Sequence, residues 1–305
     1  MDVAIRTEGL TKRYAGRAVV DDLSFTVPAG SIFGFLGPNG AGKTTTFAML
    51  CGFVRPSAGC ATVLGRPLSD LPRDRMAALP QDARFHPERT LQDSLQFLAE
   101  LQGLSPERAV AETERVLAAV DLLEARGVRG RALSHGMAKR FGVAQAFLGA
   151  PEVVLLDEPT EGLDPRNAHT VRQMIRAMSG RSTVLVSSHN LAEVEDLCDH
   201  AAIIDHGKLV AQSSLADLTG QDQQVLVRLG RAGNDMAGVL RALPRVGSVE
   251  IAANGLSLRL TLRPRPGEPV EDAISEALGA LLGCGATVGS VVRGRSLEER
   301  FLELT

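Results

Sequence analysis

The sequence has no surplus of basic residues. It contains 33 lysines and arginines against 36 aspartates and glutamates, which gives a formal net charge of −3. Proteins that bind nucleic acid generally neutralise its phosphates with a strongly basic surface. The charge balance therefore argues against a general nucleic-acid binder, and we expect no nucleic acid among the partners.

The sequence also lacks a hydrophobic run typical of a membrane span. The uncharged segment from Ala277 to Val292 contains four glycines, and it is shorter than the roughly 18 to 20 residues that a helical span needs. No basic start followed by an apolar run marks a signal peptide. We therefore expect neither a transmembrane segment nor a cleaved leader.

Cysteines and large aromatic side chains are scarce. There is no tryptophan, and Tyr14 is the single tyrosine. None of the cysteines forms a CxxC pair, which favours buried or free thiols in a reducing cytoplasm over disulfides or a zinc site. The four cysteines are Cys51, Cys60, Cys198 and Cys284.

The 305 residues suffice for one large domain or two smaller ones. In the first two thirds, short apolar strands alternate with helical patterns, which implies a parallel sheet with helices on its faces. The expected strands are 4–7, 23–27, 31–36, 153–156, 183–188 and 201–205, and the expected helices are 46–51, 168–178 and 191–198.

A helix-rich segment interrupts this alternation at about residues 84–140, which we call the helical insertion. Leu91, Leu95, Leu98 and Leu101 recur at spacings of three and four, and a second periodic run follows Pro106. Such spacing is typical of an amphipathic helix. We expect the leucines to be core rather than a membrane-binding face.

The pattern changes again near Gly220. The remaining chain predicts the order β-α-β-β-α-β, with a hairpin turn at Asn254-Gly255 and a final helix over 297–304. This order is the ferredoxin-like arrangement. We therefore predict two domains, 1–218 and 219–305, the second being small and α+β.

A glycine-rich segment follows the apolar strand that ends at Leu36 and precedes a helix. It matches the pattern G-x-x-x-x-G-K-[ST] in the required strand–loop–helix context. Its glycines let backbone N–H groups surround phosphate oxygens, Lys43 reaches the β- and γ-phosphates, and the Thr44 hydroxyl can ligate Mg²⁺. This phosphate loop consists of Gly37, Pro38, Asn39, Gly40, Ala41, Gly42, Lys43, Thr44 and Thr45.

A second apolar strand, Val153 to Leu156, ends in two carboxylates, Asp157 and Glu158. A buried strand that delivers Asp157 to the phosphate loop suits a Mg²⁺ ligand, and Glu158 can orient or deprotonate the attacking water. Alone, the pair could equally be a solvated acidic turn. The phosphate loop upstream favours the site for a nucleotide and its metal.

A third motif, Leu133-Ser134-His135-Gly136-Met137, narrows the class. The chain here resembles the ATP-binding subunit of an ABC transporter, whose LSGGQ signature it matches except at the third and fifth positions. The resemblance covers roughly residues 3–215. It implies a P-loop NTPase core with N-terminal antiparallel strands, and it implies that Ser134 and Gly136 place a hydroxyl and a backbone N–H on phosphate.

Further motifs occur in the family's order. Tyr14 stands where the family stacks a ring on adenine, and Gln81 stands where a glutamine contacts Mg²⁺ and the attacking water. Asp164, in Gly162-Leu163-Asp164-Pro165, matches the loop through which two subunits sense one another, and His189 matches the histidine that contacts the γ-phosphate. The resemblance thus implies catalytic roles for Lys43, Gln81, Glu158 and His189, nucleotide contacts by Tyr14, Ser134, Gly136, Asp164 and the phosphate loop, and metal contacts by Thr44, Gln81 and Asp157.

The resemblance also implies the cofactors and partners. We expect ATP and Mg²⁺, a head-to-tail pairing with a second copy or a relative, and membrane-spanning permease subunits that dock near Asp82 to Thr90. The chain would then lie at the cytoplasmic face of the membrane. Its end, Gly294 to Thr305, is similar to that of type 2 exporter ATPases, which favours export.

Three questions stay open at this point. An ABC-fold ATPase with a regulatory or mechanochemical role is the alternative function, although the intact Lys43, Asp157, Glu158 and His189 argue against a module that does not hydrolyse ATP. The C-terminal domain could regulate, support or mediate dimerisation, of which we favour dimer contact. The transported substrate is not indicated by any residue.

Overall fold

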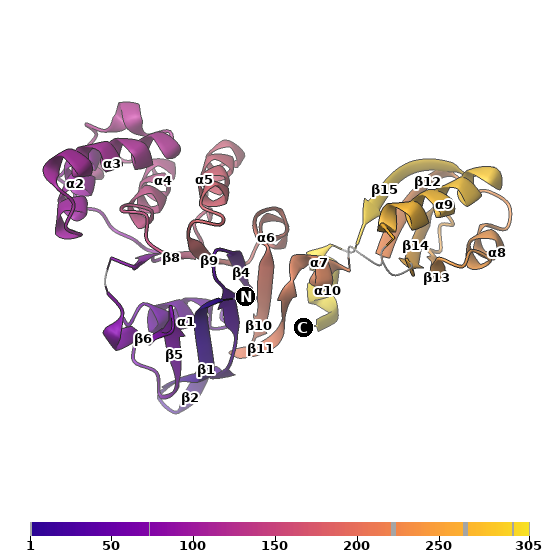
Figure 1. Ribbon diagram of the computed structural model, residues 1–305, viewed down its shortest axis with the longest axis horizontal. Coiled ribbons are helices and arrows are strands. Elements are labelled where there is room, and N and C mark those ends of the chain that lie inside the picture. Colours follow the sequence, from indigo (N-terminus) through magenta and orange to yellow (C-terminus); the bar gives the residue numbers. More distant parts are fainter. Residues whose placement is uncertain (1, 73, 221–223, 265–267, 295, 305) are drawn as a thin grey trace. The chain divides into compact units, whose positions relative to one another are not determined.

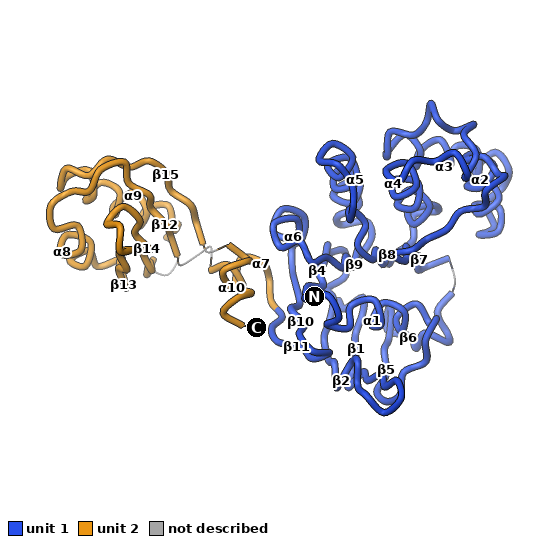
Figure 2. The backbone as a smooth tube through the Cα atoms, turned by 180° about the vertical axis from the view of Figure 1, so that it is seen from behind, with its two compact units in different colours: residues 1–212, 305 blue, residues 213–304 orange. Residues whose placement is uncertain are grey.

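The computed structural model describes residues 2–72, 74–220, 224–264, 268–294 and 296–304. The chain forms two compact units, residues 1–212 and 213–304 (Figure 2). Among the described residues, no helix is both long enough and apolar enough to cross a membrane.

The first unit is built on a six-stranded sheet in the order β11-β10-β4-β9-β8-β7. Neighbouring strands from β10 through β7 pair in parallel. Strands β4, β8 and β9 are buried at every position, as parallel strands covered on both faces require. The strands are β4 (Ile32–Leu36), β7 (Met76–Leu79), β8 (Val153–Asp157), β9 (Thr183–Ser188), β10 (His200–Asp205) and β11 (Lys208–Ser214).

A second, antiparallel sheet of the first unit has the order β2-β1-β5-β6, with β3 also paired to β1. The prediction of one strand over 23–27 was wrong. Asp22 has a φ of 55°, and the Ser24 hydroxyl accepts a hydrogen bond from the Gly9 N–H, so the chain leaves one strand and starts another. The strands are β1 (Val3–Tyr14), β2 (Arg17–Leu23), β3 (Thr26–Pro28), β5 (Ala58–Val63) and β6 (Arg66–Pro67).

Helices cover the parallel sheet and form the predicted helical insertion (Figure 1). Five of them begin at side-chain caps that accept a backbone N–H, namely Thr90, Ser105, Ser134, Asp164 and Asn190. The helices are α1 (Lys43–Leu50), α2 (Leu91–Leu101), α3 (Pro106–Ala119), α4 (His135–Ala146), α5 (Pro165–Ala177) and α6 (Leu191–Leu197), with 3₁₀ turns at Leu68–Asp70, Leu123–Ala125 and Gly130–Ala132.

The leucine stripe of α2 is core only in part. Leu91 and Leu95 are buried and Leu98 is half-buried, but Leu101 is 68% exposed. At 100° per residue, Leu101 points about 80° away from Leu91 around the helix, beyond the edge of the apolar stripe. The prediction for Leu101 was therefore wrong.

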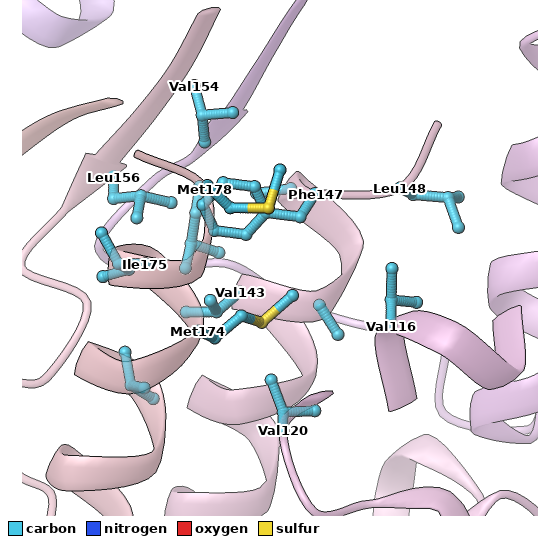
Figure 3. Packing of buried hydrophobic residues seen from close by; sticks show 14 of the residues in the cluster. Val116, Val120, Val143, Phe147, Leu148, Val154, Leu156, Met174, Ile175 and Met178 are labelled. Atoms are coloured by element: carbon cyan, nitrogen blue, oxygen red, sulfur yellow. The ribbon is translucent and has the colours of Figure 1, made fainter. Parts of the chain in front are cut away.

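One apolar cluster joins the helical insertion to the sheet. Val116 of α3 and Phe147, just after α4, lie in the same cluster as Ile175 of α5 and Leu156 of β8 (Figure 3). Close packing makes such a core stiff. Strand β8, which carries the acidic pair at its end, therefore shares one core with α3, α4 and α5.

The second unit contains the predicted ferredoxin-like arrangement. Its antiparallel sheet has the order β13-β14-β12-β15, which is 2-3-1-4 in the unit's own numbering. The turn at Asn254-Gly255 joins β13 to β14, with Gly255 at a φ of 67°. The elements are α7 (Leu215–Thr219), β12 (Gln224–Arg231), α8 (Met236–Arg241), β13 (Val246–Ile251), β14 (Ser257–Leu262), α9 (Val270–Gly283), β15 (Thr287–Arg293) and α10 (Leu297–Leu304).

Candidate functional site

The phosphate loop connects β4 to α1. Gly42, the residue that precedes α1, has a φ of 102°, a conformation that favours glycine. A Cβ there would lie 2.8 Å from the Val19 carbonyl oxygen, and a Cβ at Gly37 would clash with the Ile204 carbonyl oxygen. Both glycines are therefore needed for the loop to pass this closely against its neighbours.

Lys43 places its ammonium group inside the loop. Lys43 is only 6% exposed, and its Nζ donates hydrogen bonds to the carbonyl oxygens of Gly37 at 2.8 Å and Pro38 at 3.4 Å. Nζ also lies 3.5 Å from Oε1 of Glu158. The loop thus holds a buried cation directly beside a buried carboxylate.

A cavity of about 340 Å³ opens in front of this pair. Thr44, which is exposed, borders both this cavity and a smaller one that Asp157 lines. The larger cavity is lined by Val19, Asn39, Gly40, Gly42, Lys43, Thr44, Thr45, Gln81, Glu158 and Glu161.

Asp157 ends β8 and is 2% exposed. Its carboxylate accepts a hydrogen bond from the Ser187 hydroxyl, and no ion pair among the described residues involves it. The pKa of the nearby Cys51 thiol is raised to about 12, because the thiol is buried and because the negative charge of Asp157 opposes its ionisation. A buried carboxylate without a protein cation is costly, which suits a group that binds a metal ion.

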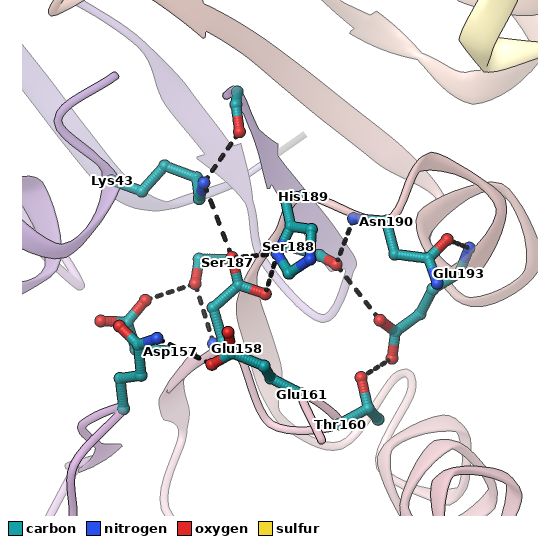
Figure 4. Close-up of polar contacts among 12 residues, drawn as sticks. Lys43, Asp157, Glu158, Thr160, Glu161, Ser187, Ser188, His189, Asn190 and Glu193 are labelled. Atoms are coloured by element: carbon teal, nitrogen blue, oxygen red, sulfur yellow. Dashed lines mark hydrogen bonds and ion pairs between the residues drawn. The ribbon is translucent and has the colours of Figure 1, made fainter. Parts of the chain in front are cut away.

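Glu158 is held by several elements at once. Its backbone has a φ of 50°, and its N–H donates to the carbonyl and the hydroxyl oxygens of Ser187. Nδ1 of His189 lies 3.1 Å from both carboxylate oxygens. Glu158 therefore lies between Lys43 and His189 at the wall of the cavity (Figure 4).

A third buried carboxylate, Glu193, supports this arrangement. Glu193, at the start of α6, is 6% exposed and accepts hydrogen bonds from the hydroxyls of Thr160 and Ser188. Thr160 follows Glu158 closely in the sequence and Ser188 precedes His189, so Glu193 joins the two loops that carry them (Figure 4). The sequence analysis missed Glu193, because a glutamate in the first turn of a helix is ordinarily explained by its favourable interaction with the helix dipole.

Gln81 also lines the cavity, and its side chain is engaged by a residue that the sequence analysis missed. Its Nε2 donates to Oε2 of Glu161 at 2.7 Å. Glu161 lies three residues after Glu158, so its closeness to the acidic pair was the only available signal. The structure therefore brings together Gln81, the phosphate loop, Glu158 and His189.

The remaining predicted nucleotide contacts lie elsewhere. Ser134 caps α4 and accepts from the Met137 N–H, and Gly136 lies in the first turn of the same helix. Asp164 caps α5 in the same way, and hydrogen bonds from Asn167 lower the pKa of its carboxyl. None of these three residues, nor the half-exposed Tyr14 at the end of β1, is among those that line the cavity.

Comparisons with known proteins identify the family of the chain. Residues 20–161 match the family model of the ABC transporter domain. The Nod factor export ATP-binding protein I of Ralstonia nicotianae is 38% identical over 70% of this chain and 68% of its own length. The daunorubicin/doxorubicin resistance ATP-binding protein DrrA of Streptomyces peucetius is 37% identical over 74% of this chain and 70% of its own.

A solved structure agrees as well. The chain superposes on the ATP-binding subunit of an ABC transporter with a TM-score of 0.64 at 30% identity, covering 72% of this chain and 92% of that one. The family match over residues 20–161 spans the phosphate loop, the signature segment and the acidic end of β8. The chain therefore belongs to the family of ABC transporter ATP-binding proteins, which are ATPases.

Proposed function

We propose that this chain binds ATP with Mg²⁺ in the 340 Å³ cavity and hydrolyses it to drive export of a substrate through separate membrane-spanning subunits. One observation carries the catalytic part of this proposal. The buried Glu158 carboxylate lies at the cavity wall with Lys43 Nζ at 3.5 Å and His189 Nδ1 at 3.1 Å. A base, a cation and an imidazole thus converge where a γ-phosphate would lie.

The chemistry follows from these positions. The N–H groups of the phosphate loop and the N-terminus of α1 favour the phosphate anions, and Lys43 neutralises their charge. Glu158 accepts a proton from water as the water oxygen bonds to the γ-phosphorus, and the bond to the bridging oxygen breaks to release ADP and phosphate. His189 holds the Glu158 carboxylate and offsets charge on the transferred group.

The oxygen groups in and beside the cavity fit a magnesium ion. Thr44 and Asp157 offer a hydroxyl and a carboxylate, and Mg²⁺ typically takes one or two such ligands together with substrate phosphates and water. The described residues contain no group of three ligating side chains that could form an all-protein cage, which agrees with this mode. When bound, Mg²⁺ would supply charge neutralisation on the phosphate oxygens, and Gln81 is the third expected contact.

A second copy of the chain is the expected partner for the remaining residues. Ser134, Gly136 and Asp164 lie at the N-termini of α4 and α5 and outside the lining of the cavity that contains Lys43. Helix N-termini favour anions. We infer that they contact ATP held by the other copy, in a head-to-tail pair.

The permease subunits would dock beside the helical insertion. The residues from Asp82 to Thr90 include several that line two cavities, of about 360 and 320 Å³, on this part of the first unit. The names of the two relatives, an export protein and a drug-resistance protein, support export. The chain would then work at the cytoplasmic face of the membrane.

Phosphate release from ATP tests the proposal. The wild-type chain should hydrolyse ATP with Mg²⁺ and stop when EDTA is added. Lys43→Ala should abolish hydrolysis, whereas Lys208→Ala, an exposed lysine of β11 that pairs with Asp21, should not change it. Full activity of Lys43→Ala would overturn the site, and co-purification of a membrane protein other than a permease would overturn the transport role.

A further inference from the structure

Lys139 joins two strand ends that carry the chemistry. It lies on α4, on the turn after the signature residues, and is half-buried. Its Nζ donates one hydrogen bond to the carbonyl oxygen of Gln81 and one to the carbonyl oxygen of Glu158, each at 3.2 Å. An ammonium group has three donors and no acceptor, so it suits two backbone carbonyls.

The two carbonyls are in equivalent places. Strands β7 and β8 pair in parallel with Leu79 opposite Leu156, so Gln81 and Glu158 each come two residues after this last aligned pair. The pairing of β7 with β8 ends at Leu79 and Leu156. Lys139 therefore supplies, from α4, a link between the two chain segments just beyond the sheet.

Glu158 needs such a link because of its backbone. A non-glycine residue is sterically disfavoured in the left-handed region, and Glu158 has a φ of 50°. Its N–H is held by Ser187 of β9, and its carboxylate faces Lys43 and His189. The hydrogen bond to its carbonyl comes from Lys139, and thus from α4.

We propose that Lys139 is a positioning residue, which fixes the backbone of Glu158 and Gln81 to α4 so that the direction of the Glu158 carboxylate depends on where α4 lies. The inference rests on the proposed role of Glu158 as the base. No ion pair among the described residues involves Lys139, so its charge is directed at the two carbonyls. Tilting of α4 relative to the sheet would then move the carboxylate.

The neighbouring Arg140 provides a matched control. Its Nη1 donates to the carbonyl oxygens of Val120 at 2.8 Å and Asp121 at 3.0 Å, both just after α3. Arg140 therefore fastens α4 to the end of α3 without touching the cavity. Arg140→Met should lower stability, while kcat for ATP hydrolysis stays near that of the wild type.

The test compares Lys139→Met, Lys139→Arg and Arg140→Met in the full chain. Lys139→Met should lower kcat by about 10- to 100-fold, because small misplacement of a reacting group has effects of this size. KM for ATP and the Kd of a fluorescent ATP analogue should change less than about two-fold, because the phosphate loop is untouched. Lys139→Arg, which keeps a donor at this place, should recover most of kcat.

Two outcomes would overturn the proposal. One is wild-type kcat in Lys139→Met, and the other is a loss that matches Arg140→Met and follows the melting temperature. Glu158→Gln separates this inference from the proposed function. If Glu158→Gln hydrolyses ATP at the wild-type rate, the base assignment fails and the inference with it. If Glu158→Gln is inactive and Lys139→Met is not, only the positioning role fails.

A double variant adds an independent readout. If Lys139 acts through the Glu158 carboxylate, Lys139→Met should leave the small residual turnover of Glu158→Gln unchanged. If Lys139 acts only on stability, the same substitution should lower turnover by an equal factor in both backgrounds. The second result would overturn the proposal.

Discussion

The two units of the chain treat charged side chains in opposite ways. Among its described residues, the first unit buries four of them, namely Lys43, Asp157, Glu158 and Glu193. Among the described residues of the second unit, the one buried polar side chain is Thr219, whose hydroxyl donates to the Leu215 carbonyl in its own helix. The arginines of the second unit pair instead with carboxylates near the surface, as in Arg245 with Glu268 and Glu276, Arg259 with Glu299, and Arg293 with Glu271.

This difference indicates where function lies. Burying a charge is costly unless it is paired and hydrogen-bonded, so a fold held only by apolar packing avoids it. The carboxyl ends of parallel strands meet at one edge of a sheet, where open α/β sheets bind ligands. In the antiparallel sheet of the second unit the strand ends alternate, and its core is apolar.

The largest expected effect tests whether the buried charges of the first unit serve catalysis. Glu158→Gln should lower turnover by about 10²- to 10⁴-fold, the usual contribution of a general base, while ATP binding persists. Phosphate release and binding of a fluorescent ATP analogue would measure the two quantities. Glu100→Gln, on an exposed residue of α2, is the control and should be silent. If Glu158→Gln and Glu100→Gln were equally active, the buried charges of the first unit would have no demonstrated role in catalysis.

The second prediction concerns the apolar core of the second unit. Leu260 lies on β14 and is fully buried, and Leu260→Ala should lower the free energy of unfolding of this unit by about 2 to 5 kcal/mol. KM for ATP should not change, because the cavity lies within the first unit. Circular dichroism during urea unfolding would measure stability, with the half-exposed Leu256→Ala as control. A loss of ATP binding in Leu260→Ala would show that the two units do not divide their roles in this way.

A third prediction concerns Glu193, the buried charge that faces hydroxyl groups. Glu193→Gln replaces an acceptor oxygen with an amide donor opposite Thr160 or Ser188. It should cost about 1 to 3 kcal/mol of stability and lower kcat several-fold, because both hydroxyls belong to the loops beside Glu158 and His189. Thermal unfolding and ATP hydrolysis would be compared with Glu114→Gln, an exposed position of α3. Unchanged kcat together with lowered stability would make Glu193 purely structural.

The smallest effect concerns the thiols. Burial is the main cause that raises the pKa of Cys51, to about 12, and that of Cys198, which is also raised by the charges of Glu193 and Asp199. An ordinary thiol has a pKa of 9.0, so below pH 9 the thiols are protonated in both the folded and the unfolded chain. As the pH rises from 9 toward 12, the thiols ionise more readily in the unfolded chain, and the folded chain loses stability.

At pH 8.5, iodoacetamide should therefore modify the exposed Cys60 first and spare Cys51 and Cys198. Mass spectrometry of peptides would locate the label, and Cys60→Ser should remove the fast phase. Rapid labelling of Cys51 in the folded chain would contradict the burial that the structure assigns to the surroundings of Asp157.

The parts of the site that could be predicted are those that lie in short, contiguous segments. The phosphate loop and the acidic end of β8 each consist of neighbouring residues whose types determine local geometry. The same holds for the β-α-β-β-α-β order of the second unit. Leu101 and the break between β2 and β3 were mispredicted, because local patterns do not reveal how far an apolar stripe extends or where a backbone turns.

The sequence by itself determined the local geometry of the phosphate loop and of the acidic end of β8, because the strand, the loop and the helix that follow one another in the chain also follow one another in space. Only the tertiary structure decided what surrounds them. Glu161 beside Gln81, Glu193 between two loops and Lys139 at the carbonyls of Gln81 and Glu158 come from segments separated by up to 80 residues in the sequence. Such contacts arise from the packing of α4 and α6 against the ends of β7, β8 and β9, and no local pattern encodes that packing.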